Sequence, residues 1–182
     1  MPSWTVRMAE TSDAAPIAGL IRLAFANQSR PTHPPSSALQ ETAETIRTDL
    51  ADGGGAVVDD GGMIVGAVLW NEDEGGLYIG RLSVHPDHRR RGIASALMHE
   101  AEREAYRQGL RRLWLGVRLV LDDNRRFFAA HGFKETTLHR HEGFTEPTWV
   151  TMERELPSPP EGERALFELK RSPRAMRRGP RR

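Results

Sequence analysis

The sequence predicts one α/β domain, because strand and helix patterns alternate along it and meet at one clear junction. Residues 78–84 follow the two-residue period of a strand, and residues 93–105 carry apolar side chains three and four positions apart, the period of an amphipathic helix. Residues 85–88 form a turn between them, since Pro86 fixes one backbone dihedral. A strand followed by a turn and a helix is a unit from which α/β domains are built.

Length and composition suit a domain with its own core. The chain has 182 residues, of which 38% are hydrophobic and 28% charged, the balance of an ordinary globular protein. It contains no cysteine, which excludes disulfides and thiolate catalysis. The sequence contains no apolar run long enough to cross a membrane and starts with no secretory signal pattern, so we expect a cytoplasmic protein.

Charge is distributed unevenly along the chain. Residues 157–182 hold eight Lys and Arg against three Glu, whereas residues 1–156 carry a net charge of −4. A proline-rich start followed by a basic run is typical of a solvated, flexible segment. We therefore predict a domain over residues 1–156 and a flexible tail over residues 157–182.

Two helices are expected after the first strand. Residues 4–8 alternate as a short strand, and residues 17–25 repeat apolar side chains on one helical face. The serine pair that follows the polar loop 30–35 can cap a second helix over about residues 38–50.

Glycines and acidic turns divide the rest of the domain into strands and two more helices. The expected strands are 56–58, 63–70, 78–84, 112–117, 133–138 and 148–156. The expected helices are 92–108, ended by Gly109, and a short one ended by Gly132 and capped by Asp122, Asp123 or Asn124.

The helix that starts at Gly92 has the features of an anion site. The first N–H groups of a helix have no partner within it, and together with the helix dipole they attract negative charge. Gly92 has no side chain and Ala94 a small one, so a phosphate can approach the backbone closely. The three preceding arginines add permanent positive charge. We interpret the segment as a pyrophosphate cradle, with a helix start beside a solvated basic cluster as the alternative.

Two motifs make the chain resemble the GNAT superfamily of acetyl-CoA-dependent N-acetyltransferases. Arg89-x-x-Gly92-x-Ala94, directly after a strand, resembles motif A. The segment 117–133, which ends in Gly-Phe, resembles motif B. The two motifs occur in the family's order, and the resemblance covers about residues 4–156.

The resemblance implies both a fold and a donor site. The fold is a mixed, mostly antiparallel central sheet of about seven strands with about four helices, splayed between the strands ending near Val84 and Val117. Acetyl-CoA is implied as co-substrate, without a metal. Its pantetheine would pair with the backbone of the first splayed strand, its pyrophosphate with N–H groups at the helix start, and its thioester end would lie near motif B. The residues so implied are Leu82, Ser83, Val84, Arg89, Arg90, Arg91, Gly92, Ile93, Ala94, Ser95, Asn124, Phe127 and Phe128.

Motif B lacks side chains that many family members use in catalysis. Phe128 stands at the place of a tyrosine that protonates the leaving thiolate, and phenylalanine has no proton to donate. A frequent asparagine corresponds to Leu121, with Asn124 nearby as a partial substitute. Tyr78 occupies the place of a glutamate base found in some members. We name Tyr78 as the catalytic candidate, lining the acceptor pocket and ordering a water, with an ordinary strand tyrosine as the alternative.

Several loop residues are candidates for contact with the acceptor. By the resemblance, His33, Ser36 and Ser37 follow the first helix where the family shapes its acceptor site, although a loop and a helix cap explain each of them better when taken singly. Glu142 and Glu146 lie between the last two strands, where the family often contacts acceptors.

Two further clusters of titratable residues occur in the sequence. His139 and His141 could share a strand face as zinc ligands do, but no third ligand has matching spacing, which favours a solvated strand end. The acidic stretch 71–74 could attract a cationic acceptor or relay its proton.

The expected function is transfer of an acetyl group from acetyl-CoA to a primary amine, by direct attack in a ternary complex. The acceptor is a small amine, an amino acid or a protein amino group. The alternative is a non-catalytic acyl-CoA-binding or regulatory module. A third interpretation assigns nucleic-acid binding to the basic tail, but no aromatic residue is interleaved among its seven final cations. No membrane partner is expected, and a homodimer stays open.

Overall fold

The computed structural model describes residues 3–158. The strands are β1 (Thr5–Met8), β2 (Gly54–Asp60), β3 (Met63–Asp73), β4 (Gly76–Val84), β5 (Arg112–Arg118), β6 (Lys134–His139) and β7 (Trp149–Glu155). The helices are α1 (Ala14–Ala26), α2 (Ala43–Asp52), α3 (Ile93–Gln108) and α4 (Asp122–Ala130), with short 3-10 turns η1 (Thr11–Asp13), η2 (Ser37–Gln40) and η3 (Pro86–His88).

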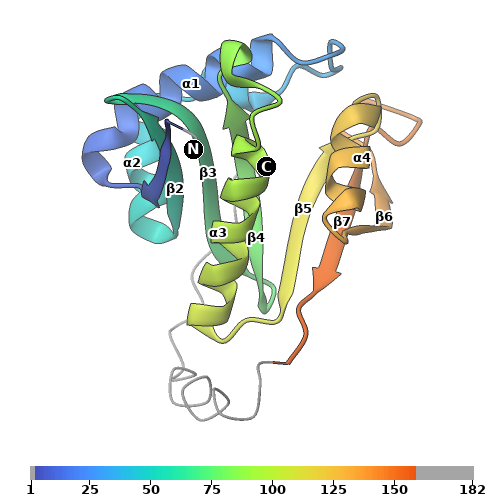
Figure 1. The fold of residues 1–182 in the computed structure, drawn as a ribbon. Coiled ribbons are helices and arrows are strands. Elements are labelled where there is room, and N and C mark those ends of the chain that lie inside the picture. Colours follow the sequence, from blue (N-terminus) through green and yellow to red (C-terminus); the bar gives the residue numbers. More distant parts are fainter. Residues whose placement is uncertain (1–2, 159–182) are drawn as a thin grey trace.

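The described strands form a single sheet in the order β1-β2-β3-β4-β5-β7-β6 (Figure 1). Every neighbouring pair is antiparallel except β4 and β5, which are parallel. The expected mixed, mostly antiparallel sheet of about seven strands with four helices is thereby confirmed. Most of the predicted tail lies outside the described residues, so the division at residue 156 stays a prediction.

Alternation along the strands supplies an apolar core to each face of the sheet. Val58 and Val68 belong to the core under α3, which continues through Phe128 of α4. Their strand neighbours Val57 and Ala67 belong to the second core, under α1 and α2. Because successive strand side chains point to opposite faces, α3 and α4 cover one face and α1 and α2 the other.

Two predicted helix starts differ from the structure. The helix expected over 38–50 divides into η2 and α2, because Thr42 and Thr45 form a reciprocal capping box that starts a new helix at Ala43. Ser36 caps η2 instead, accepting a hydrogen bond from the N–H of Ala38. The helix α4 has Leu121 at its N-cap and no side-chain cap, so the capping role expected for Asp122, Asp123 or Asn124 was wrong.

A β-bulge in β4 changes which residues share a face. Ala67 pairs with Ser83 and Leu69 with Gly80, so three steps along β4 oppose two along β3. The extra residue is accommodated at Arg81, whose φ of 55° is left-handed. The two-residue period predicted over residues 78–84 puts Tyr78, Gly80 and Leu82 on one face, and the bulge moves Leu82 to the opposite one, against the α3 core. That part of the prediction was wrong, because alternation alone does not reveal an inserted residue.

The sheet splays between β4 and β5. Their pairing is limited to Leu77 with Leu113 and Tyr78 with Trp114, after which the two strands diverge (Figure 1). The gap therefore opens toward the strand ends at Val84 and Val117, where the family resemblance placed it.

A testable consequence for stability concerns Asp13 at the start of α1. Its carboxylate accepts two hydrogen bonds from Arg7, at 2.7 and 2.9 Å, and one from the N–H of Glu10 at 2.8 Å. The Arg7 hydrogen bonds lower the pKa of Asp13 below its ordinary 3.8. A lowered carboxyl pKa stabilises the fold above the ordinary pKa and ceases to do so as pH falls through the lowered value.

We expect Asp13→Asn to lower the free energy of unfolding by about 1–2 kcal/mol at pH 7, measured by urea denaturation. The difference from wild type should shrink below pH 3.8. The exposed Glu72→Gln is the control and should change stability little. An Asp13→Asn effect of equal size at pH 7 and below the lowered pKa would contradict this account.

Candidate active site

The start of α3 offers an open backbone site. Gly92 is the N-cap with a φ of 78°, and no side chain caps the first N–H groups of the helix. A Cβ added at Gly92 would meet nothing within 4 Å. Ala94 and Ser95 follow on the first turn and are half-buried. Uncapped N–H groups beside an open glycine fit a phosphate, as the cradle interpretation requires.

The three arginines of the motif have different partners. Arg89 donates to the backbone carbonyls of Asn27 at 2.8 Å and Ala24 at 3.3 Å, at the end of α1. Arg91 lies 3.6 Å from the carboxylate of Asp60 in β2. Arg90 is exposed and has a left-handed φ of 60°. Arg89 thus holds the end of α1 against the loop before α3, and Arg91 lies beside a carboxylate.

The helix α4 stands beside α3 across the gap and is joined to it by one hydrogen bond. The Nε2 atom of His131 lies 3.1 Å from Oγ of Ser95, while its Nδ1 lies 2.9 Å from the carbonyl of Phe127. The rings of Phe127 and His131 pack at 4.3 Å. Phe128, at 8% exposure, belongs to the core with Phe133, whereas Asn124 and Phe127 are only partly buried.

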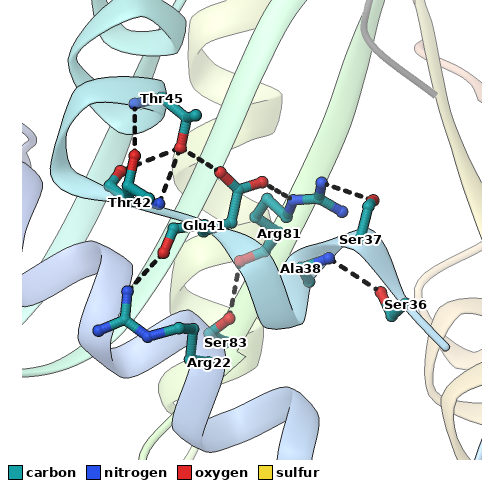
Figure 2. A network of polar contacts seen from close by, with 9 residues as sticks. All are labelled: Arg22, Ser36, Ser37, Ala38, Glu41, Thr42, Thr45, Arg81 and Ser83. Carbon is teal, nitrogen blue, oxygen red and sulfur yellow. Dashed lines mark hydrogen bonds and ion pairs between the residues drawn. The ribbon is translucent and has the colours of Figure 1, made fainter.

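A network of polar contacts fixes the bulge to the segment before α2 (Figure 2). The Nε atom of Arg81 lies 2.7 Å from Oε1 of Glu41, and its Nη2 donates to Ser37 at 3.1 Å. Glu41 is 7% exposed, accepts from Thr45 through its other oxygen, and its backbone carbonyl accepts from Arg22 of α1.

Arg81 and Glu41 form a positioning pair that sequence patterns missed. A partly buried ion pair of this kind holds the left-handed Arg81 in place and joins β4 to η2. Glu41 stood within a predicted helix and Arg81 within a regular strand, so neither pattern marked them. Of the acceptor candidates before α2, Ser37 joins this network and Ser36 caps η2, while His33 is exposed.

The face of the gap opposite α3 is lined by aromatic residues and two glycines. The rings of Tyr78 and Trp114 pack at 4.7 Å where the gap closes. A Cβ on Gly80 would lie 3.1 Å from the ring of Tyr78, and one on Gly116 would lie 3.3 Å from the ring of Trp149. Both glycines therefore face this side, where the Tyr78 ring lies against Gly80 and the Trp149 ring against Gly116.

The two histidines considered as zinc ligands, His139 and His141, form hydrogen bonds with threonines in β7 and just before it. His139 stacks on Trp149 at 3.8 Å, and its Nε2 lies 2.8 Å from the hydroxyl of Thr151. The Nδ1 atom of His141 lies 2.5 Å from the hydroxyl of Thr148. Across residues 3–158, no group of three or more acidic or His side chains is arranged to hold a metal ion.

The loop after β6 forms a pocket lined by residues 140–145. Glu142 contributes to it and is exposed, as is Glu146 just beyond. The acidic stretch 71–74 lies at the closed end of the gap, where the backbone carbonyl of Asp73 accepts from Trp114 and that of Glu74 from Arg112.

The sequence comparison identifies the family. Residues 21–133 match the model described as Acetyltransferase (GNAT) family, which spans both motifs, so the chain belongs to that family. It is therefore an acetyltransferase, with acetyl-CoA as its acetyl donor. No curated protein sequence matches the chain.

Solved structures of other proteins share the fold at low sequence identity. The ribosomal-protein-S18-alanine N-acetyltransferase of Escherichia coli is 20% identical with a TM-score of 0.70, over 87% of this chain and 97% of that one. The PaiA N-acetyltransferase of Thermoplasma acidophilum, solved with coenzyme A, is 16% identical with a TM-score of 0.70, over 85% and 99%. The protein yncA of Salmonella typhimurium, solved with acetyl-CoA, is 17% identical with a TM-score of 0.65, over 86% and 95%. None of the helices in residues 3–158 has the length and apolar character needed to cross a bilayer.

Gly92→Glu should abolish acetyl-CoA binding, measured by titration calorimetry. The carboxylate would occupy the open space at the N-cap and repel the pyrophosphate. Gly75→Glu is the matched control, because Gly75 also has a positive φ of 73° and open surroundings but lies in the β3–β4 turn at the other end of β4. Both variants carry the same backbone strain, so equal loss of binding in the two would count against the cradle.

Proposed function

We propose that the protein acetylates a primary amine by direct attack in a ternary complex. The observation that carries the proposal is the uncapped, glycine-led start of α3 at the mouth of the gap between β4 and β5. An anion site and a strand edge without a partner are the two features that a phosphate-bearing, extended donor requires. Family membership supports acetyl transfer as the reaction class. Direct attack by the amine and a primary amine as acceptor are parts of our proposal.

In this proposal the donor carries the acyl thioester, and residues of the chain bind and orient it. The N–H groups of Ile93, Ala94 and Ser95 would hold its pyrophosphate, with Arg90 adding charge. The backbone of Leu82, Ser83 and Val84 would hold its extended arm, since β5 does not pair with that edge. Asn124 and Phe127 of α4 would close the opposite side of the gap. Phe128 is mostly in the core, so its contact would be limited to its remaining exposed edge.

Tyr78 carries the one candidate catalytic hydroxyl in this proposal. Its ring lies over Gly80 at the bulge, on the side of the sheet away from α3. We assign it to ordering a water that accepts the proton lost by the attacking amine. The amine nitrogen forms the new bond to the acetyl carbon, the carbon–sulfur bond breaks, and the thiolate leaves without a tyrosine acid, because Phe128 occupies that place. A thiol with an ordinary pKa near 8.5 is an adequate leaving group.

The test of the proposal is acetyl-CoA-dependent release of CoA with a panel of small amines, amino acids and short peptides. Turnover with at least one primary amine, and none with the matching tertiary amine, is the expected result. Tight acetyl-CoA binding with no turnover on any acceptor would favour the alternative, a non-catalytic acyl-CoA-binding module.

Tyr78→Phe should lower kcat by about tenfold to a hundredfold, with the KM for acetyl-CoA unchanged. The ring that packs on Trp114 is retained, so the fold should be unaffected. Tyr106→Phe is the matched control, because the Tyr106 hydroxyl donates to the carbonyl of Pro157, away from the gap. Equal kcat values for Tyr78→Phe and wild type would make Tyr78 an ordinary strand residue.

A further inference from the structure

Arg118 is the last residue of β5, at the open end of the gap between β4 and β5. Leu115 and Val117 belong to the core under α3 and α4, so the alternating positions Gly116 and Arg118 face the other way. Arg118 pairs in register with Trp149 of β7. It therefore stands on the same face as Gly116, one step further toward the open end.

Arg118 is partly buried and has no counter-ion. Within residues 3–158 no side chain or carbonyl forms a hydrogen bond or ion pair with its guanidinium, and burial alone lowers its pKa. This differs from other cations of the C-terminal half, since Arg112 pairs with Glu153 and Arg125 with Glu135. A cation removed from water without a partner is unfavourable for folding and is a feature of sites that bind an anion.

No carboxylate raises the pKa of Arg118, which burial alone lowers. Burial, and after it the positive charge of Arg118, lower the pKa of His141 below its ordinary 6.5, which favours the neutral imidazole at pH 7. Trp149, the cross-strand neighbour of Arg118, stacks on the ring of His139, so two aromatic rings lie beside Arg118. The acidic turn after β3 is at the other end of β5, beside Arg112, about 20 Å away along the strand.

We propose that Arg118 binds a carboxylate of the acceptor, so that the amine substrate is one that also carries a carboxylate. The inference rests on the proposed function and narrows it to a substrate class. One net positive charge matches one carboxylate, whereas a phosphate dianion would leave charge uncompensated. The guanidinium fork also binds the two carboxylate oxygens together. The stretch 71–74, which the sequence pattern linked to a cationic acceptor, lies away from this position.

The test compares paired acceptors that differ in one carboxylate. CoA release is measured with glycine, leucine and phenylalanine, with their carboxamides, and with a dipeptide amide beginning with aspartate, whose carboxylate is on the side chain. Binding of the three N-acetyl amino acids and their carboxamides to the CoA-loaded protein is measured by calorimetry. Both sets are repeated with Arg118→Met, and with Arg47→Met, an exposed α2 arginine, as control.

Wild type and Arg47→Met should prefer the carboxylate member of a pair by about 10- to 100-fold, and Arg118→Met should lose that preference with an unchanged Kd for acetyl-CoA. The free amino acids and the aspartyl peptide distinguish an α-carboxylate from a side-chain carboxylate. Arg118→Met should unfold at the same or a higher temperature, since it removes an unpaired cation, whereas a purely structural arginine would lower it.

Two results overturn the inference. One is equal use or binding of carboxylates and carboxamides by wild type, and the other is a preference that survives in Arg118→Met. If carboxamides are acetylated as well as carboxylates, the proposed function stands and this inference alone fails. If no amine yields CoA, the proposed function fails, and the calorimetric pairs still decide whether Arg118 recognises a carboxylate.

Discussion

The ion pair between Arg81 and Glu41 is the contact on which the geometry of the gap depends. A left-handed arginine in a strand is unfavourable without support, and a buried carboxylate without a partner is more so. Each group compensates for the other. The resulting bulge turns Tyr78 and Gly80 toward one side of the sheet and Leu82 toward the other. One side therefore carries Tyr78 and Gly80, and the other packs on α3.

Most of the fold could be predicted from hydrophobic periodicity and from two short motifs. The helix over 93–108 was predicted to within one residue, because glycines with positive φ mark both of its ends. The division of the second helix at Thr42 was not predicted, since Ser36, Ser37 and Thr42 are all good caps and sequence does not rank them. The bulge at Arg81 left no pattern, because it depends on a contact with Glu41, forty residues earlier.

The backbone features of the candidate site could be read from the sequence more directly than the partners of its charged side chains. Gly92 predicted an anion site because the prediction depended only on a missing side chain, which lets a phosphate approach the backbone N–H groups. The arginines before it looked equivalent in sequence, yet Arg89 supports the end of α1 and Arg91 lies beside Asp60. The significance of Arg118 likewise depends on which carboxylates lie near it, and that is decided by strand pairing. A cluster of charged residues in the sequence therefore indicates the charge of a binding partner less reliably than a charged side chain that has no counter-ion in the folded structure.

The short pairing between β4 and β5 has a consequence for the whole molecule. The backbones of the two halves of the sheet pair at only two positions there, and the apolar core under α3 and α4 joins the halves on one face. A donor lying in the gap would supply contacts to both halves where the strands supply none. A ligand that binds only the folded chain stabilises it by mass action. A co-substrate bound in the gap would therefore make the stability of the contact between the two halves depend on its concentration.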